Sequence, residues 1–153
     1  MKKLIAILLL LVLLISLSIG VSAVSDESST VIYFQESSTE DGYTIIDTIT
    51  LCPQLTRSGT KTATRSATVY REGTLIAEIA FTATFHYDGT TVSVISKAVT
   101  QTDTYNGWNY KQQSFTSSGG TVTLEAKLTK LLIFNNSFTM RLSCDTDGNI
   151  TIA

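Results

Sequence analysis

Residues 74–86, TLIAEIAFTATFH, decide the fold of this chain, because apolar and polar side chains alternate along them. Strand side chains point to opposite faces of a sheet in turn, so a period of two marks a strand with two unlike faces. The segment therefore predicts an antiparallel strand with one face in a core and one in water. The predicted inner face holds Leu75, Ala77, Ile79, Phe81, Ala83 and Phe85.

Turn signals lie on both sides of this strand. Glu72-Gly73 precedes it and Asp88-Gly89 follows it, and such pairs favour tight turns because glycine readily adopts positive φ. Asn106-Gly107 and Asn135-Asn136 are expected to be turns of the same kind. Further strands are expected at residues 31–35, 43–51, 60–70, 91–104, 108–116, 121–131, 137–144 and 149–152.

One irregularity is predicted within residues 91–104. The apolar positions change phase between Val94 and Ile95, which indicates a β-bulge or a bend. A bend of this kind would help a strand turn between two packed sheets.

About nine short strands and no helical period after the N-terminus predict an all-β fold. We expect an antiparallel β-sandwich, immunoglobulin-like in class, with a barrel as the alternative. Residues 31–153 would form a single domain after a polar leader at residues 24–30. Threonine suits such a sheet, because its β-branch favours extended backbone while its hydroxyl tolerates water.

The N-terminus has the features of an export signal. Lys2 and Lys3 precede an unbroken apolar run over residues 4–15, and Val21-Ser22-Ala23 fits a signal peptidase site. We expect residues 1–23 to be a signal peptide and the protein to be secreted, extracellular or held at a cell surface, with no membrane contact after cleavage. An uncleaved membrane anchor is the alternative.

Charge excludes one class of partner. The chain carries 11 Lys and Arg against 13 Asp and Glu, and losing Lys2 and Lys3 would make the exported part more acidic. A nucleic-acid binder would need a basic surface, so no nucleic-acid partner is expected. The aliphatic content and the one Pro argue against a disordered stalk.

The exported part has two cysteines, Cys52 and Cys144. An even count in an oxidising compartment favours a disulfide between them. The alternative is two buried free thiols that behave as small apolar residues.

No set of residues supports catalysis or a metal site. His86 is the one histidine, and no Gly-x-Ser-x-Gly motif accompanies it, so the catalytic set is expected to be empty. Asp145 and Asp147 have a spacing that calcium loops use, but Asp147-Gly148 is explained by a turn. No metal and no cofactor are expected.

The most suggestive segment for binding is residues 105–110, where three aromatic and two amide side chains surround one expected hairpin turn. Aromatic faces stack on sugars or proteins, and amides bind hydroxyl or backbone groups. Packing of Trp108 and Tyr110 at the end of the core is the alternative. The candidate binding residues are Tyr105, Asn106, Trp108, Asn109 and Tyr110.

Several segments of the sequence resemble those of a known group of proteins. They are residues 60–65 (TKTATR), residues 81–89 (FTATFHYDG), Gly107-Trp108 and residues 142–148 (LSCDTDG). Together they resemble small exported, Thr/Ser-rich β proteins of Gram-positive, often gut-dwelling, bacteria, a group without assigned function. The resemblance covers residues 60–153, implies a bacterial secreted protein and transfers no catalytic residue.

These observations predict a non-enzymatic module that binds an unknown protein or glycan surface, or that assembles at the cell surface. Self-association through an exposed edge strand is a further expectation. The alternatives are a small extracellular hydrolase, which would use His86 or the loop acids, and a secreted antibacterial or toxin-like factor.

Overall fold

The computed structural model describes residues 29–52, 59–131 and 134–152, and every regular element within them is a β-strand. The predicted signal peptide, residues 1–23, and the leader up to residue 28 lie outside the described residues. The strands are β1 (Thr30–Ser38), β2 (Tyr43–Cys52), β3 (Thr60–Arg71), β4 (Thr74–Tyr87), β5 (Val92–Thr104), β6 (Asn109–Ser118), β7 (Thr121–Lys130), β8 (Phe134–Cys144) and β9 (Ile150–Thr151).

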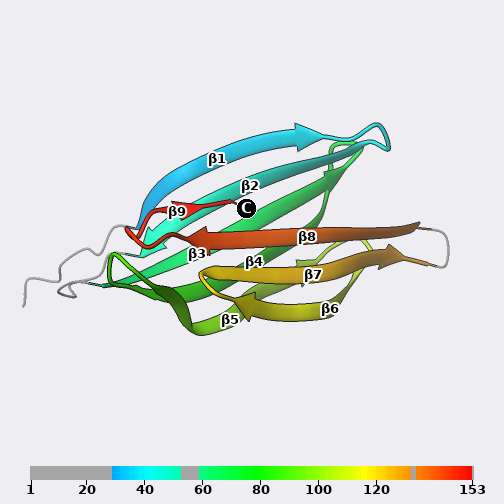
Figure 1. Cartoon of the computed structure of the whole chain (residues 1–153). Helices are drawn as coiled ribbons and strands as arrows, with labels where there is room; N and C mark the ends of the chain where they lie inside the picture. Colours follow the sequence, from blue (N-terminus) through cyan, green and yellow to red (C-terminus); the bar gives the residue numbers. More distant parts are fainter. Residues whose placement is uncertain (1–28, 53–58, 132–133, 153) are drawn as a thin grey trace, which may run out of the picture.

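The strands form two antiparallel sheets, which Figure 1 shows as two layers. One sheet has the order β1-β2-β3-β4-β5 and the other has the order β6-β7-β8-β9. The predicted all-β, antiparallel class and the expected number of strands are confirmed. Each sheet is a meander in chain order, so the likeness to an immunoglobulin domain is one of architecture and not of Greek-key connections.

The core lies between the two sheets. Phe81 and Phe85 of β4 are fully buried, as are Leu124 and Leu128 of β7. Phe81 also packs edge-on against Phe115 of β6, with ring centres 5.5 Å apart. The alternation read from residues 74–86 therefore describes the inner face of β4 correctly from Ala77 to Phe85.

Three bulges interrupt the pairing of β4 with its two neighbours, β3 and β5. Ile95 is the extra residue between the pairs Phe85–Val94 and Thr84–Ser96, so the predicted bulge is confirmed. Its side chain is 58 % exposed. Thr100 forms a second bulge in β5.

The third bulge is in β4 and was not predicted. Ile76 lies between the pairs Tyr70–Leu75 and Val69–Ala77. As a result Ile76 is buried in the core, whereas Leu75, the residue expected there, is only half-buried.

Two turn predictions were wrong in detail. Asn106-Gly107 is a turn, with φ of 55° and 78°, but it joins β5 of one sheet to β6 of the other and is not a hairpin turn. Asn135-Asn136 lies inside β8, paired with Thr129 and Leu128, so the chain reverses before it. Asparagine is frequent in turns, but here the apolar residues on either side continue the strand.

The predicted disulfide is absent, since Cys52 and Cys144 are both free thiols. Alternation explains why. Cys52 follows Leu51, which packs against the core, so its side chain lies on the outer face of β2. Cys144 is buried in the core on the inner face of β8. A sheet therefore separates the two thiols.

One side of the sandwich is closed by cations. β9 pairs only with Ser143 and Cys144, so the rest of β8 is an edge of its sheet. Three residues of β3 that share its inner face reach across to β8 or to the turn after it. Lys61 Nζ donates to the carbonyl of Gly148 at 2.6 Å, Arg65 Nη1 donates to the carbonyl of Arg141 at 2.6 Å, and Arg71 lies over the ring of Phe134.

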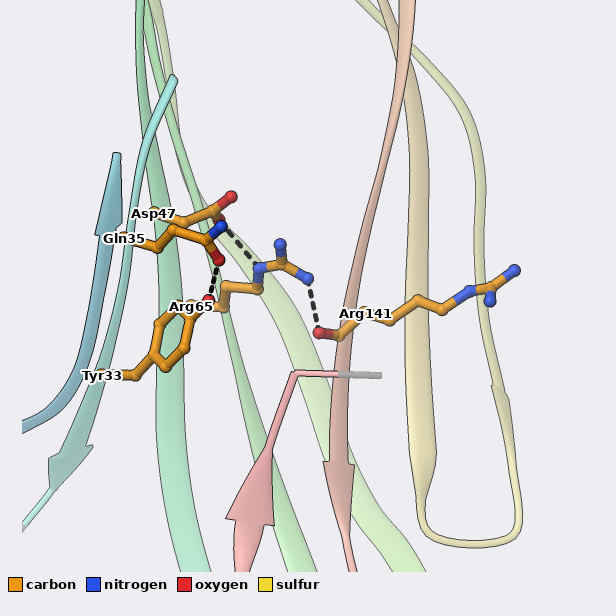
Figure 2. Close-up of polar contacts among 5 residues, drawn as sticks. All are labelled: Tyr33, Gln35, Asp47, Arg65 and Arg141. Carbon is orange, nitrogen blue, oxygen red and sulfur yellow. Dashed lines mark hydrogen bonds and ion pairs between the residues drawn. The ribbon is translucent and has the colours of Figure 1, made fainter. Parts of the chain in front are cut away.

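Arg65 is the central member of this row, and Figure 2 shows it extending from β3 between the two sheets. Its Nε donates to Asp47 Oδ1 of β2 at 3.0 Å. The side chains of Arg65 and Asp47 are only 7 % and 20 % exposed. This ion pair and the bond to Arg141 tie β2, β3 and β8 together, so a charged residue forms part of the core.

We expect Arg65→Met to lower the free energy of unfolding by about 2–4 kcal/mol, because it leaves the Asp47 carboxylate mostly buried without its partner. Urea unfolding followed by circular dichroism measures this loss. The double variant Arg65→Met, Asp47→Leu should recover at least half of it, since an apolar pair carries no buried charge. A double variant as unstable as the single one would contradict this explanation.

We expect the folded protein to contain two thiols under oxidising conditions. The pKa of the Cys144 thiol is raised by burial, and the nearby Asp145 carboxylate raises it further, so Cys144 should resist alkylation at pH 8 until the protein is unfolded. Mass spectrometry after iodoacetamide treatment measures the labelling. A gain of two hydrogens on reduction would instead show a disulfide.

Candidate functional site

The turn between β5 and β6 is anchored to the bulge at the start of β4. The backbone N–H of Tyr105 donates to the carbonyl of Ile76 at 3.0 Å, and Asn106 Nδ2 donates to the carbonyl of Leu75 at 2.9 Å. The backbone N–H of Trp108 closes the turn on the carbonyl of Tyr105 at 3.1 Å. These bonds fix the turn at one end of the sandwich.

Trp108 is part of the core and not of an open surface. Its side chain is 5 % exposed. It meets Tyr43 edge-on, with ring centres 6.3 Å apart, and its ring centre is 6.0 Å from that of Phe134. Packing, the alternative stated above for this residue, describes its position.

The two tyrosines of the predicted site are also engaged by the protein. Tyr105 Oη donates to Glu78 Oε2 at 2.5 Å, and this bond raises the pKa of Tyr105 to about 12. Tyr110 is half-buried, and burial raises the pKa of its phenol. Its hydroxyl has no hydrogen-bond partner within the described residues. Asn109 is exposed. The structure therefore does not bring the five predicted residues together on one surface.

Two of them, Asn106 and Trp108, line a cavity of about 240 Å³ beside the turn, which we call the end cavity. An adjoining hollow of about 270 Å³ shares two of its lining residues, Arg71 and Phe134. The end cavity is lined by Arg71, Glu72, Thr74, Ile76, Asn106, Trp108, Lys130 and Phe134.

Arg71 is the most distinctive residue of the end cavity. Its guanidinium carbon is 3.8 Å from the ring centre of Phe134 and 5.4 Å from that of Tyr43. The ion pair between Arg65 and Asp47 is the single one in the described part of the chain, so Arg71 and Lys130 have no acidic partner there. Glu72 is the acidic side chain that lines the cavity with them, and no ion pair joins it to either cation within the described residues.

The aromatic rings of the cavity offer little open face. Phe134 is covered by Arg71 and contacts Trp108, which is itself buried. Stacking of a ligand on an aromatic face needs a ring that solvent can reach. The cavity is therefore a cationic pocket on an aromatic floor rather than an aromatic platform.

His86 lies at the opposite end of the sandwich strands, beside a hollow of about 570 Å³ that Asp88 and Asp147 also line. The Asp88 carboxylate accepts the backbone N–H groups of Thr91 at 2.6 Å and Thr90 at 2.9 Å. These bonds lower the pKa of Asp88. Within the described residues no hydrogen bond joins His86 to an acid or a hydroxyl.

Asp145 stabilises the turn between β8 and β9. Its carboxylate accepts from Asn149 Nδ2 and from the backbone N–H groups of Asn149 and Asp147, at 2.8–2.9 Å. These bonds, the Asn149 side chain first, lower the pKa of Asp145. The described residues contain no cluster of three metal-ligating side chains.

The residues that sequence reasoning missed are Arg71, Lys130 and Phe134. They come from the ends of three strands, β3, β7 and β8, and only the pairing of Lys130 with Phe134 and the packing of the two sheets bring them together. One signal was present: Lys61, Arg65 and Arg71 occupy the same alternate positions as Ala63, Ala67 and Val69.

Comparison with models of known protein families, with curated proteins and with solved structures gave no match to this chain. Among the described residues there is no helix that could cross a membrane.

We expect Asp145→Ala to lower the urea midpoint at neutral pH. A carboxyl whose pKa is depressed by folding stabilises the fold above its unfolded pKa and loses that effect as pH falls through the folded value. The difference from the native protein should therefore close in acid.

Asp147→Ala is the matched control, because the Asp147 carboxylate accepts no hydrogen bond within the described residues and should change the midpoint little at any pH. A midpoint loss for Asp145→Ala that persists undiminished at pH 2 would contradict the assigned role.

Proposed function

We propose that this chain is a secreted or cell-surface, non-enzymatic binding module whose contact site is the end cavity. The observation that carries the proposal is the pair of cations, Arg71 and Lys130, that line a cavity without an acidic partner among the described residues. Pockets that combine a few placed polar groups with an apolar floor are the usual form of a binding site.

Contrast with other charged groups supports this choice. Lys61 and Arg65, on the same face of β3, are both engaged by carbonyl groups of the other sheet. Asp88 and Asp145 cap their own turns. Groups whose hydrogen bonds hold the fold together cannot also bind a partner without cost. The better candidates are therefore Arg71 and Lys130, whose charged groups make no hydrogen bond or ion pair within the described residues.

The partner would be a glycan or a protein at the surface where the chain is exported. The expected export rests on Lys2, Lys3 and the apolar residues after them, and the resemblance to exported β proteins of Gram-positive bacteria agrees with it. Binding at the end of the strands would leave both sheet faces free.

Assembly through an edge strand stays a prediction. β1 is the edge strand of the larger sheet, and Phe34 on it is 65 % exposed. Exposed apolar edges can pair with another chain.

The test is to fill the end cavity. Thr74 is exposed and lines the cavity, so Thr74→Trp should leave the fold intact and block entry. On an array of bacterial glycans, and in pull-downs of surface proteins, we expect binding to fall by about tenfold or more, as a steric block does.

Thr139→Trp is the matched control, because Thr139 is equally exposed but lies in the middle of β8, away from the cavity. It should bind as the native protein does. Equal binding by native protein and Thr74→Trp, or turnover of a bound glycan, would overturn the proposal.

A further inference from the structure

We infer that the end cavity recognises a sugar that carries a carboxylate, with Arg71 as the residue that binds the carboxylate. This inference rests on the proposed function and specifies the ligand class of the same site. The proposed function holds for any ligand of the end cavity, whereas this inference requires a ligand with a carboxylate.

Arg71 is prepared for a carboxylate. Its guanidinium is held 3.8 Å from the ring centre of Phe134, and the Tyr43 ring lies on another side. Stacking fixes the plane of the guanidinium and leaves its N–H groups to donate within that plane. A planar fork of donors matches the two oxygens of a carboxylate, and such charge-assisted pairs are the strongest hydrogen bonds in proteins.

The net charge of the side chains that line the end cavity suits a ligand with one negative charge. Arg71 and Lys130 bring two positive charges to the end cavity, and Glu72 brings one negative charge. The residual single positive charge would be neutralised by one carboxylate. Glu72 would repel that carboxylate at short range, so its removal should strengthen binding.

The remaining polar groups suit hydroxyls. Asn106 Nδ2 is committed to the carbonyl of Leu75, which leaves Asn106 Oδ1 to accept. Thr74 supplies a hydroxyl, and Glu72 can accept from a second ligand hydroxyl. Donors and acceptors therefore both line this one cavity, as recognition of a polyol requires.

Size restricts the ligand to about one ring. The end cavity holds about 240 Å³, below the range of pockets that take drug-sized molecules. The adjoining hollow of about 270 Å³ shares Arg71 and Phe134 with the end cavity and is also lined by Asp41. A neighbouring sugar unit of a chain would find room there.

The test uses fluorescence of Trp108, the single tryptophan of the chain, which lines the end cavity. The purified exported protein is titrated at pH 7 with sodium glucuronate, with glucose and with inorganic phosphate. We expect a saturable change with glucuronate, and affinities for glucose and phosphate that are lower by about tenfold or more, the loss expected for one charge-assisted fork.

Four variants test the assigned roles. Arg71→Gln and Lys130→Gln should each weaken glucuronate binding, Arg71 by about tenfold, and Arg71→Lys should bind between Arg71→Gln and the native protein because it keeps the charge but not the fork. Glu72→Gln should bind more tightly. Urea midpoints confirm that each variant is folded. If Arg71→Gln does not fold, the effect of Lys130→Gln on glucuronate binding still tests the inference.

Each other result has a definite meaning. Glucose binding as tightly as glucuronate, or phosphate doing so, overturns the acidic-sugar inference. Glucuronate binding that neither Arg71→Gln nor Lys130→Gln weakens also overturns it. If no probe binds while Thr74→Trp still abolishes array binding, the inference fails and the proposed function stands. If Thr74→Trp changes nothing on the array, the proposed function itself fails.

Discussion

Three cations on the inner face of β3 close the side of the sandwich that β9 is too short to cover. β9 pairs with only two residues of β8, so most of that strand has no neighbour on one side within the described residues. Lys61, Arg65 and Arg71 reach it or the turn after it at three levels. The β5–β6 turn joins the two sheets on the opposite side. Without the three cations, the sheets would meet along β8 only through apolar contacts. The row of cations fixes the distance between the two sheets on this side and their relative orientation.

The same row includes Arg71, the cation of the proposed binding site. Arg65, at the middle, is buried and bound to Asp47 and to the carbonyl of Arg141, so it is fully used by the fold (Figure 2). Arg71, at the end, lies over the ring of Phe134, and its guanidinium makes no hydrogen bond or ion pair within the described residues. A ring fixes the guanidinium but does not satisfy its N–H groups. In the proposed function, the inner face of β3 serves the fold at Arg65 and ligand binding at Arg71.

The sequence predicts the features that depend on neighbouring residues, such as strand faces and bulges. It does not predict which distant segments come into contact. Alternation gave the inner face of β4, and a change of phase gave the bulge at Ile95, because both depend on neighbours in the chain. The Asn106-Gly107 turn was expected, but whether a turn joins neighbouring strands or two sheets is decided by distant packing. The disulfide failed for a local reason: Cys52 follows Leu51 and so faces outward. Arg71 and Phe134 are far apart in the sequence and come together only in the tertiary structure. The spacing of residues in the sequence therefore could not predict the end cavity.

Two arginines on the inner face of β3 have different roles: Arg65 is bound by the fold, and Arg71 is proposed to bind a ligand. Exchange of their Nε–H protons with water, followed by nuclear magnetic resonance on the native protein, tests this difference most directly. We expect the Arg65 proton to be strongly protected, because its Nε donates to Asp47, and the Arg71 proton to exchange fast until sodium glucuronate is added. Equal protection of both protons in the free protein would contradict it.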